Sequence, residues 1–581
     1  MAFVGYFNSA PHLNEALDRA ARKFESFAAS KKFLGSVFIF ILICMMYSST
    51  KGLSLYDEGL ICYGAERVLV GDLPYRDFWT AYGPGQYYLL GGVFKIFGTS
   101  LLAARMYCVS VEWIVAILAY LISRRLTGPV GGVLSFVSVA VWLNCDRSVL
   151  YPVIPALAFA LAGFLSLARS ASIPKNIILA GVFTGCATVV RYDLGLYTFI
   201  GQSVILVGQR FVGPIGSEKP PSQASGKVKR LLIYIVAASA VVLPTFLAFT
   251  RAVPRQMLYE IFVDFPLRIY PQFRSIPFPA PQNFGLIYGL PLLILITSAV
   301  FLPSMWLRYR LRNAENCLAV GLVLFGFAVF LSVRVRPDIL HMVVPMVAPL
   351  ILVPWLVQVM NASRTSRFVY ISFSILLLMC VGRLMFDCTR RDVLYWRNGR
   401  AAEFVPVRIN RATGISMRRD TDGLVEAVHY IQEKAPAGEP IYVGNTRHDE
   451  IFLNNALFYF LSGRRSATRF SELHPGIATT YKVQSEIIEE IKRQKVTYVV
   501  LWKAPRSSEP NRSSESSGVT ILDDFIKANY EPIAGFGDFV ILLSSGSRDT
   551  SGESTRGRHG DRRTIAQKAA SAGAGHLSLW L

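Results

Sequence analysis

Long, nearly uncharged blocks of apolar residues recur between residues 33 and 387 of this 581-residue chain. A helix of about 20 apolar residues spans a bilayer, and backbone inside the bilayer must satisfy its own hydrogen bonds, which a helix does. The blocks lie at 33–50, 87–122 with a break around Gly98, 130–143, 149–168, 176–190, 194–209, 231–250, 285–305, 317–333, 339–359 and 367–386. The sequence therefore predicts an α-helical polytopic membrane protein with about eleven transmembrane helices.

The positive charges of the chain indicate how these helices are oriented. Lys and Arg are concentrated before the first block and in alternate loops after it, which is typical of cytoplasmic segments. The positions are Arg19, Arg22, Lys23, Lys31, Lys32, Arg124, Arg125, Arg169, Lys175, the 210–230 stretch, Arg308, Arg310, Arg312, Arg364 and Arg367. We therefore expect a cytoplasmic N-terminal segment over 1–32, a first block that is a retained signal anchor in the inner (plasma) membrane, and a chain that lies outside after residue 387.

The overall composition agrees with a membrane protein and gives no support to nucleic-acid binding. Apolar residues make up 52% of the chain, above the roughly 45–50% typical of soluble domains. The net charge is +21. Because the Lys and Arg residues are dispersed over loops that flank the membrane and form no single basic face, we expect no nucleic-acid partner.

The pattern changes after the last apolar block. Residues 388–545 alternate predicted helices with short β-branched strands, which is typical of an α/β domain. The predicted helices lie at 423–434, 450–461, 480–493 and 523–529, and the predicted strands at 440–444, 496–502 and 539–543. The chain from 33 to 387 is thus expected to be the membrane domain and 388–545 an extracytoplasmic α/β domain. Residues 546–581 are rich in Ser, Gly and Arg and are predicted to be a disordered basic tail.

An acidic pair, Asp57-Glu58, follows the first apolar block, in a predicted first outer loop over 51–86. Two adjacent carboxylates at a membrane surface are costly to keep ionised, so they indicate chemistry or binding of a cation. A simpler reading is that Asp57 caps the helix that follows it, a role that Asp fills well. The same loop contains the sequence Pro-Tyr-Arg-Asp-Phe-Trp at 74–79 and the sequence Tyr-Gly-Pro-Gly at 82–85.

Further ionisable residues cluster at the predicted outer ends of other helices. The positive-inside rule leaves few cations there, so the set is expected to line a cavity at the outer leaflet. Its members include Arg76, Asp77, Arg191, Asp193, Arg334, Arg336, Asp338 and His341. The alternative is that each Arg/Asp pair is only an interfacial salt bridge, which contributes little stability. Asp338 and His341 are three residues apart and are expected to share one helix face.

The acidic pair, the short helix over 60–70, the Pro-Tyr-Arg-Asp-Phe segment and the Gly-Pro-Gly start of the second span together resemble the GT-C glycosyltransferases. More narrowly, they resemble the bacterial, family-39-like branch that groups protein mannosyltransferases with the aminoarabinose transferase of lipid A. The resemblance is strongest over residues 30–125. It implies a GT-C-like membrane domain, a polyprenyl-phosphate sugar donor, an acceptor that approaches from the outer side, and inversion at the anomeric carbon.

The resemblance assigns roles to the acidic pair and to the cations. Asp57 matches the first acid of the family pair and is expected to be the general base, while Glu58 is expected to position Asp57, the acceptor or a cation. Arginine offers a bidentate fork to phosphate oxygens, so the outer arginines are candidates for binding the donor phosphate. These candidates are Arg76, Arg105, Arg191, Arg334 and Arg336. Candidates for acceptor binding or support are Asp77, Tyr82, Asp338 and His341.

One stretch departs from the family pattern. Relatives of the aminoarabinose-transferase type carry a Glu-Lys-Pro segment near the start of the second span, which contributes to binding of metal and phosphate. Residues 81–85 here read Ala-Tyr-Gly-Pro-Gly, so neither contact can be carried over. We hypothesise that Arg76 and Asp77 substitute for them, although Asp77 could simply shape a turn. No cofactor is assigned, and the need for a divalent cation stays open.

The predicted outer loop over 251–284 contains six prolines and several aromatic residues. Such a loop suits a lid over a lipid chain, and equally an interfacial anchor that gates nothing. Taken together, the sequence predicts an inverting glycosyltransferase that acts at the outer face of the membrane on a glycolipid, glycan or protein acceptor. The alternatives are a transporter or flippase of lipid-linked sugars, which would need charged or broken helices near the bilayer midplane, and a non-catalytic assembly protein.

Overall fold

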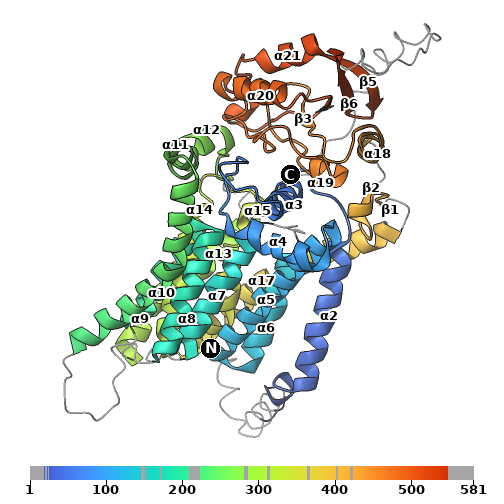
Figure 1. Cartoon of the computed structure of the whole chain (residues 1–581). Coiled ribbons are helices and arrows are strands. Elements are labelled where there is room, and N and C mark those ends of the chain that lie inside the picture. The colour runs from blue at the N-terminus through green and yellow to red at the C-terminus, as the bar shows by residue number, and fades with distance from the viewer. Residues whose placement is uncertain are drawn as a thin grey trace. The chain divides into compact units, whose positions relative to one another are not determined.

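The computed structural model describes residues 19, 23, 25–145, 151, 153–169, 173–208, 223–280, 285–309, 314–362, 367–400, 404–418 and 423–546. It divides into two compact units, described separately below (Figure 1). The membrane unit comprises residues 1–419 together with 508–514, and the C-terminal unit comprises 420–507 together with 515–581. The predicted tail, apart from residue 546, and most of the predicted N-terminal segment lie outside the described residues.

The membrane unit is built from helices. The first group is α2 (Lys31–Ser49), α3 (Asp57–Leu69), α4 (Gly85–Phe97), α5 (Leu101–Thr127), α6 (Pro129–Cys145), α7 (Val153–Arg169), α8 (Pro174–Val190) and α9 (Tyr192–Gly208). The second is α10 (Gln223–Ala252), α11 (Arg255–Tyr259), the π-helix η3 (Glu260–Ile269), α12 (Tyr270–Arg274), α13 (Gly285–Tyr309), α14 (Ala314–Ser332), α15 (Ile339–Met342), α16 (Val347–Ala362) and α17 (Arg367–Arg400).

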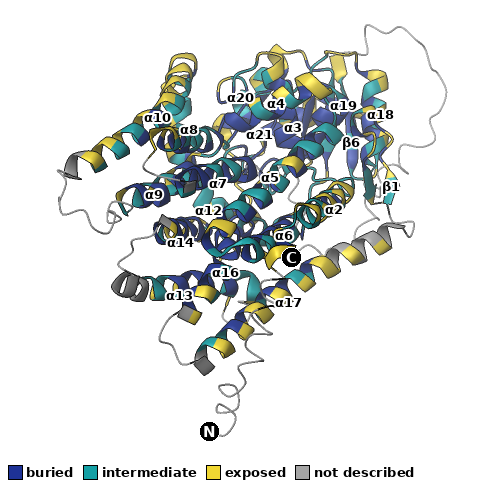
Figure 2. Cartoon of the chain, turned by 90° about the horizontal axis from the view of Figure 1, so that it is seen from below, coloured by how far each residue is buried: buried dark blue, intermediate teal, exposed yellow. Residues whose placement is uncertain are grey.

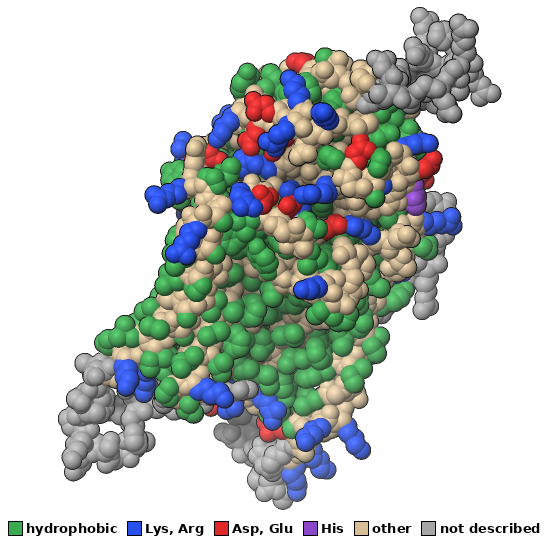
Figure 3. All heavy atoms as spheres, viewed as in Figure 1, with side chains coloured by type: hydrophobic (Ala, Val, Ile, Leu, Met, Phe, Trp, Pro, Cys, Tyr) green, Lys and Arg blue, Asp and Glu red, His purple; other side chains and the backbone are tan. Residues whose placement is uncertain are grey.

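Many of these helices have the composition of membrane spans, as predicted. Within the described residues, six are long and apolar enough to cross a bilayer, namely those over Lys31–Ser49, Leu101–Thr127, Gly226–Ala252, Gly285–Leu302, Glu315–Ser332 and Tyr370–Arg390. Shorter apolar helices occupy Pro129–Cys145, Val153–Ala168, Pro174–Val190 and Val347–Asn361. On the face drawn in Figure 3, hydrophobic side chains form a broad belt over the membrane unit, with Lys and Arg side chains along its lower edge and charged side chains of both signs above it. The number of crossings stays a prediction.

Two predicted blocks are interrupted, each for an identifiable backbone reason. Gly98 adopts a left-handed conformation (φ 86°) that ends α4, and the Ser100 hydroxyl then caps α5 by accepting from the Ala103 amide at 3.2 Å. This confirms the predicted break around Gly98. The 339–359 block is split into α15 and α16 by a turn that contains Pro345, which has no amide hydrogen to continue a helix.

The core of the membrane unit lies among α5, α6, α7, α14 and α16, whereas α2 and α10 keep largely exposed faces (Figure 2). Small residues allow some of these helices to approach closely. A Cβ added to Gly201 on α9 would lie 2.7 Å from the Gly321 carbonyl oxygen on α14. Polar side chains also bond across this core: the Trp142 indole on α6 donates to the Val343 carbonyl at 2.8 Å.

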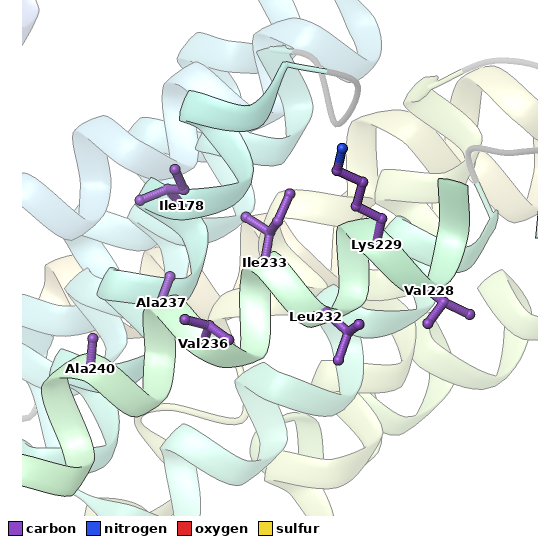
Figure 4. A pocket seen from close by; sticks show the side chains of 8 residues that line it. All are labelled: Ile178, Val228, Lys229, Leu232, Ile233, Val236, Ala237 and Ala240. Atoms are coloured by element: carbon purple, nitrogen blue, oxygen red, sulfur yellow. The ribbon is translucent and has the colours of Figure 1, made fainter. Parts of the chain in front are cut away.

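A groove runs between α8 and the first half of α10, with a volume of about 860 Å³ (Figure 4). The groove is lined by Ile178 from α8 and by apolar residues over 228–240 from α10, and Lys229 is its one charged residue. It holds no group suited to catalysis. At the other end of α10, Phe249 packs on Tyr75 with ring centroids 5.4 Å apart.

The membrane unit extends further along the chain than the predicted boundary at 387. Helix α17 continues to Arg400, and the hairpin of β1 (Phe404–Pro406) and β2 (Ser416–Arg418) then binds the connection after α2. The Gly52 amide donates to the Ser416 carbonyl at 2.8 Å, and the Ser416 amide donates to the Thr50 carbonyl at 2.9 Å. These backbone bonds between distant segments leave no pattern in the sequence around residue 400.

The C-terminal unit has the predicted α/β character. Its sheet has the order β3-β4-β6-β5, with β3 (Tyr442–Asn445) and β4 (Tyr498–Trp502) parallel, and β6 (Phe539–Ser544) antiparallel to both β4 and β5 (Tyr530–Phe536). Its helices are α18 (Leu424–Lys434), α19 (Leu457–Ser462), α20 (Tyr481–Arg493) and α21 (Ile521–Asn529).

One predicted helix of this unit starts later than expected. The sequence predicts a helix over 450–461 begun by Asp449, whereas α19 begins at Leu457. The Asp449 carboxylate instead pairs with Arg447 at 2.6 Å and accepts the Ser516 hydroxyl. The N-cap position of α19 is occupied by Ala456, and the Asn455 side chain accepts the Phe458 amide at 3.1 Å in the first turn.

Candidate active site

The first turn of α3 is fixed by a buried ion pair. Glu58 and Arg105 are both fully buried, and the Arg105 guanidinium donates to the two Glu58 carboxylate oxygens at 2.6 and 2.7 Å. Arg105 also donates to the carbonyls of Ser49 and Gly52, each at 2.7 Å, and Glu58 accepts the Ser54 amide at 2.9 Å. All three guanidinium nitrogens of Arg105 are thus bound to α3 and to the connection between α2 and α3, which argues against the predicted role as a phosphate ligand.

Asp57 begins α3 directly beside this pair. The capping position is occupied by Tyr56, so the alternative in which Asp57 is the helix cap is wrong. Asp57 is half-buried, and within the described residues its carboxylate takes part in no hydrogen bond or ion pair. Burial raises the pKa of this carboxyl above its ordinary value, against the opposing charges of His341 and Arg274. A carboxylate with a raised pKa and no structural partner is a candidate for proton transfer.

A second cluster lies near Asp57, at the start of α15. Asp338 caps this helix by accepting the His341 amide at 2.9 Å, and its carboxylate also lies 2.6 Å from His341 Nδ1. Arg336 Nε donates to the other carboxylate oxygen at 2.7 Å. Burial alone would raise the pKa of Asp338, but His341 and Arg336 outweigh it and lower that pKa to about 2. Asp338 and His341 thus share one turn, as their spacing predicted, and His341 Nε2 lies 3.3 Å from the Tyr270 hydroxyl.

Arg191, between α8 and α9, is the best placed of the five predicted phosphate ligands. It uses Nε to pair with Asp193 at 2.9 Å. Its two terminal amino groups donate to no partner in the part of the chain that is described. Arg191 interacts electrostatically with Tyr151 and Tyr82, and Tyr151 in turn interacts with Asp57. Arg191 therefore belongs to the same electrostatic cluster as Asp57.

The described part of the predicted 251–284 loop, up to residue 280, is mostly helical. It forms α11, η3 and α12, and Pro266 lies inside the π-helix, where its missing amide hydrogen disrupts regular α-helical bonding. Its aromatic residues pack on the first predicted outer loop: the rings of Phe262 and Tyr75 have centroids 5.2 Å apart, and those of Phe265 and Trp79 lie 5.4 Å apart. This packing places η3 against residues 75–79.

Sequence reasoning missed three residues of this cluster. Arg274 and Tyr270 come from α12, and Tyr151 precedes α7. Burial raises the pKa of the Tyr270 phenol, and the phenols of Tyr270 and Tyr151 both interact electrostatically with Asp338 and Arg191. The only signal that could have singled out Arg274 is its position as a cation in a predicted outer loop, a feature that it shares with Arg255 and Arg268.

The Arg76-Asp77 pair serves a turn. Asp77 accepts the Leu73 amide at 2.7 Å and pairs with Arg76, whose side chain is 47% exposed. The preceding residue, Tyr75, has a left-handed backbone conformation (φ 74°) and a buried side chain. Its hydroxyl donates to the Tyr82 carbonyl at 2.9 Å. None of the described contacts brings Arg76 or Asp77 to Asp57. The hypothesis that this pair replaces the missing Glu and Lys gains no support from these contacts.

The last two predicted phosphate ligands differ in their surroundings. Arg334 is exposed, and its side chain takes part in no ion pair or hydrogen bond among the described residues. Arg336 is held on all sides: besides Asp338, it donates to the two Glu509 carboxylate oxygens at 2.5 and 2.8 Å and to the Arg274 carbonyl at 2.9 Å. Arg336 is thus occupied by protein groups in this arrangement.

The described residues do not form a metal centre. Within them, no group of three His, Cys, Asp or Glu side chains lies close enough together to hold an ion. Asp57, Glu58 and Asp338 each have a cationic neighbour that competes with a metal. The donor set therefore does not fit a resident metal, and no step of the chemistry below is routed through one.

Comparisons with known proteins agree with this architecture. Residues 82–213 match the sequence profile of the dolichyl-phosphate-mannose-protein mannosyltransferase family. No individual curated protein sequence matches the chain. Two crystal structures of ArnT from Cupriavidus metallidurans share 12% identity and a TM-score of 0.52 with it. The apo form covers 89% of this chain, the form bound to undecaprenyl phosphate covers 88%, and each is itself 98% covered. The apo oligosaccharyltransferase of Archaeoglobus fulgidus aligns less well, with a TM-score of 0.48 and 11% identity over 81% of this chain and 70% of its own.

Proposed function

Because the chain has the GT-C fold of ArnT, we propose that it transfers a sugar from a polyprenyl-phosphate donor to a hydroxyl group of an acceptor. The observation that carries this proposal is Asp57, a half-buried carboxylate with a raised pKa and no structural partner among the described residues, close to His341 and Arg274. The ArnT structure bound to undecaprenyl phosphate and the family named for dolichyl-phosphate-mannose support the class of donor.

In the proposed reaction, the acceptor hydroxyl oxygen attacks the anomeric carbon of the donor sugar. The new glycosidic bond forms as the bond from that carbon to the phosphate oxygen breaks, and attack opposite the leaving group inverts the configuration. Asp57 takes the hydroxyl proton, and its raised pKa makes it a better proton acceptor than an ordinary aspartate. The bond electrons leave with the polyprenyl phosphate, whose charge needs stabilising donors.

Arg191 and Arg274 are the cations that we propose for the phosphate. Arg191 has terminal donors directed to no protein partner among the described residues, and Arg274 interacts electrostatically with Asp57. Two arginines from separate elements can contact different phosphate oxygens and stabilise the charge that develops on departure. Asp338 orients His341, which, with Tyr82, remains a candidate for contacting the acceptor or the phosphate.

We further propose that this cluster faces the outside of the inner membrane, with the N-terminus cytoplasmic and the C-terminal unit extracytoplasmic. The support is the alternation of Lys and Arg in the sequence. The class of acceptor, whether glycolipid, glycan or protein, is to be identified from the products of the reaction. A reporter active only in the cytoplasm, fused after Leu543, should be silent, and an active reporter would overturn the orientation.

The function is tested with purified protein in lipid nanodiscs, a radiolabelled polyprenyl-phosphate sugar and an envelope lipid extract as acceptor. Transfer of label to a new product, lost in Asp57→Asn, supports the proposal. Mass spectra of envelope glycolipids from cells with and without the protein then identify the acceptor. If the donor is carried across proteoliposome membranes at equal rates by the wild type and Asp57→Asn, with no product formed, the protein is a transporter instead.

A further inference from the structure

A short segment in the last third of the chain belongs to the membrane unit. Residues 508–514, with the sequence Ser-Glu-Pro-Asn-Arg-Ser-Ser, cluster with that unit, whereas the residues up to 507 and from 515 belong to the C-terminal unit. We call this segment the strap. It is therefore a piece of the membrane unit that is joined at both ends to the chain of the other unit.

The strap binds α12 and the residue that follows it. The Asn511 side-chain amide donates to the Ser275 carbonyl at 2.8 Å. The Arg512 guanidinium lies over the Phe273 ring, 5.2 Å from its centroid, a distance at which cation–π attraction operates. A short 3-10 turn over Arg512–Ser514 packs on α12.

The strap also binds the turn that carries Asp338. Glu509 forms the bidentate pair with Arg336 described above, and both side chains are largely buried. Asn511 donates a second hydrogen bond to Glu509 at 2.9 Å and so ties this pair to the α12 contact. Burial alone would raise the pKa of Glu509, but the hydrogen bonds from Arg336 and Asn511 lower it, so the carboxylate is ionised at neutral pH.

The two segments that the strap joins carry residues of the candidate active site. The first segment is α12, which carries Tyr270 and Arg274, and the second is the turn at the start of α15, which carries Asp338 and His341. Direct polar contacts also join them: the Ile276 amide donates to the Val335 carbonyl at 3.0 Å, Arg336 donates to the Arg274 carbonyl, and the Tyr270 hydroxyl lies 3.3 Å from His341 Nε2. The strap therefore adds polar contacts that hold these two short elements together.

Glu509 also decides how Arg336 shares its donors. With Glu509 holding both terminal amino groups, Arg336 gives only Nε to Asp338 Oδ2, and Oδ1 stays with His341. Without Glu509, the Arg336 fork is free to take both oxygens of Asp338, since a bidentate pair is the stronger arrangement. His341 would then lose the partner that orients its ring.

We propose that the strap is a positioning element of the active site and that Glu509 is its anchor, setting α12 and the Asp338-His341 turn in place around Asp57. This inference rests on the proposed function. The strap is part of the membrane unit, and the chain on both sides of it belongs to the C-terminal unit.

The first test needs no substrate. Hydrogen exchange is measured on the full-length protein in nanodiscs, for peptides spanning 258–276 and 335–342. Glu509→Gln should accelerate exchange there by about tenfold, because a charge-assisted bidentate pair becomes a weaker neutral contact. Asn511→Ala should accelerate exchange mainly in the first peptide. Glu489→Gln, at an exposed position on α20, is the matched control and should change neither. Unchanged exchange in Glu509→Gln overturns the proposal.

The second test separates positioning from competition. Binding of undecaprenyl phosphate should weaken several-fold in Glu509→Gln and recover in part in Glu509→Asp, which restores the charge. Tighter binding by Glu509→Gln would overturn the proposal, because Glu509 would then compete with the phosphate for Arg336. If the wild type neither binds this lipid nor transfers any sugar, the proposed function fails, while the exchange result still decides whether the strap positions α12.

Discussion

The Glu58 carboxylate on α3 and the Arg105 guanidinium on α5 form a bidentate pair at 2.6 and 2.7 Å, with both side chains fully buried. They are 47 residues apart in sequence. Moving Glu58 would leave a buried charge unpaired, so the pair fixes the position of the first turn of α3 relative to α5. Asp57, the preceding residue, is held by this turn and is left with its own carboxylate uncommitted among the described residues. In the proposed reaction, the Glu58-Arg105 pair would therefore act by holding Asp57 in position.

We predict that Arg105→Ala destabilises the protein by about 3–5 kcal/mol, the range measured when one partner of a buried ion pair is removed. The measurement is thermal unfolding in detergent. Arg76→Ala is the control, since its pair with Asp77 is exposed and contributes only about 0–1 kcal/mol. If Arg105→Ala melts like the wild type and loses only affinity for a polyprenyl phosphate, Arg105 is a phosphate ligand after all.

The sequence predicted local features of the site and missed the contacts that tie its parts together. Asp57 and Glu58 are adjacent, and Asp338 and His341 are one turn apart, so their grouping needs only the chain itself. Arg105 was assigned to phosphate because nothing in its helix shows that it faces a carboxylate on another helix. Arg274 carries no local signal, since its interaction with Asp57 depends on tertiary packing such as that of η3 on Tyr75 and Trp79. Glu509 lies more than 170 residues from Arg336, and no periodicity reports such a pairing.

Donor binding should depend on Arg191 and Arg274. We predict that Arg191→Ala and Arg274→Ala each weaken binding of undecaprenyl phosphate by roughly 10- to 100-fold, the range expected for loss of a charge-assisted hydrogen bond. Lys at either position should restore part of the affinity, because it keeps the charge and loses the planar fork. Calorimetric titration of the lipid measures these effects.

Arg334→Ala is the matched control for these two variants, because Arg334 is an exposed arginine outside the cluster. It should bind undecaprenyl phosphate like the wild type. Normal affinity in both Arg191→Ala and Arg274→Ala would remove these residues from the phosphate site and return attention to Arg336.

Asp338 should make the protein sensitive to acid. Its pKa is about 2 in the folded state, against an ordinary value of 3.8, so the ionised form is stabilised by folding. This contribution is fully present above pH 3.8 and is lost as the pH falls toward 2, and it amounts to something on the order of 2 kcal/mol. Unfolding midpoints measured from pH 2 to 5 should fall more steeply in the wild type than in Asp338→Asn. Parallel curves would show that Asp338 has no such stabilised charge.

Asp57 should show the opposite linkage, which allows its stability and its activity to be separated. Its pKa is raised in the folded state, so the folded protein binds the proton more tightly than the unfolded chain. Its effect on stability is thus most favourable below pH 3.8 and declines as the pH rises through the raised value. At neutral pH the folded state bears the cost of the buried, ionised Asp57 carboxylate. Asp57→Asn removes this cost and should be at least as stable as the wild type.

The same variant should nevertheless lose transfer by about 10²- to 10⁴-fold, the range attributed to general-base catalysis. Asn keeps the size of the side chain, and because Tyr56 holds the capping position, no helix cap is lost. Binding of undecaprenyl phosphate should stay near normal, so the loss should fall on kcat. Wild-type kcat/KM should rise with pH through the raised Asp57 pKa, since only the ionised carboxylate accepts a proton.

Asp77→Asn is the control, because Asp77 is an acid of the same predicted outer loop that shapes a turn. This variant should transfer at close to the wild-type rate. A stable Asp57→Asn protein with wild-type kcat would leave the reaction without its proposed base, and the lipid-linked sugar would then have to be treated as cargo to be moved across the membrane.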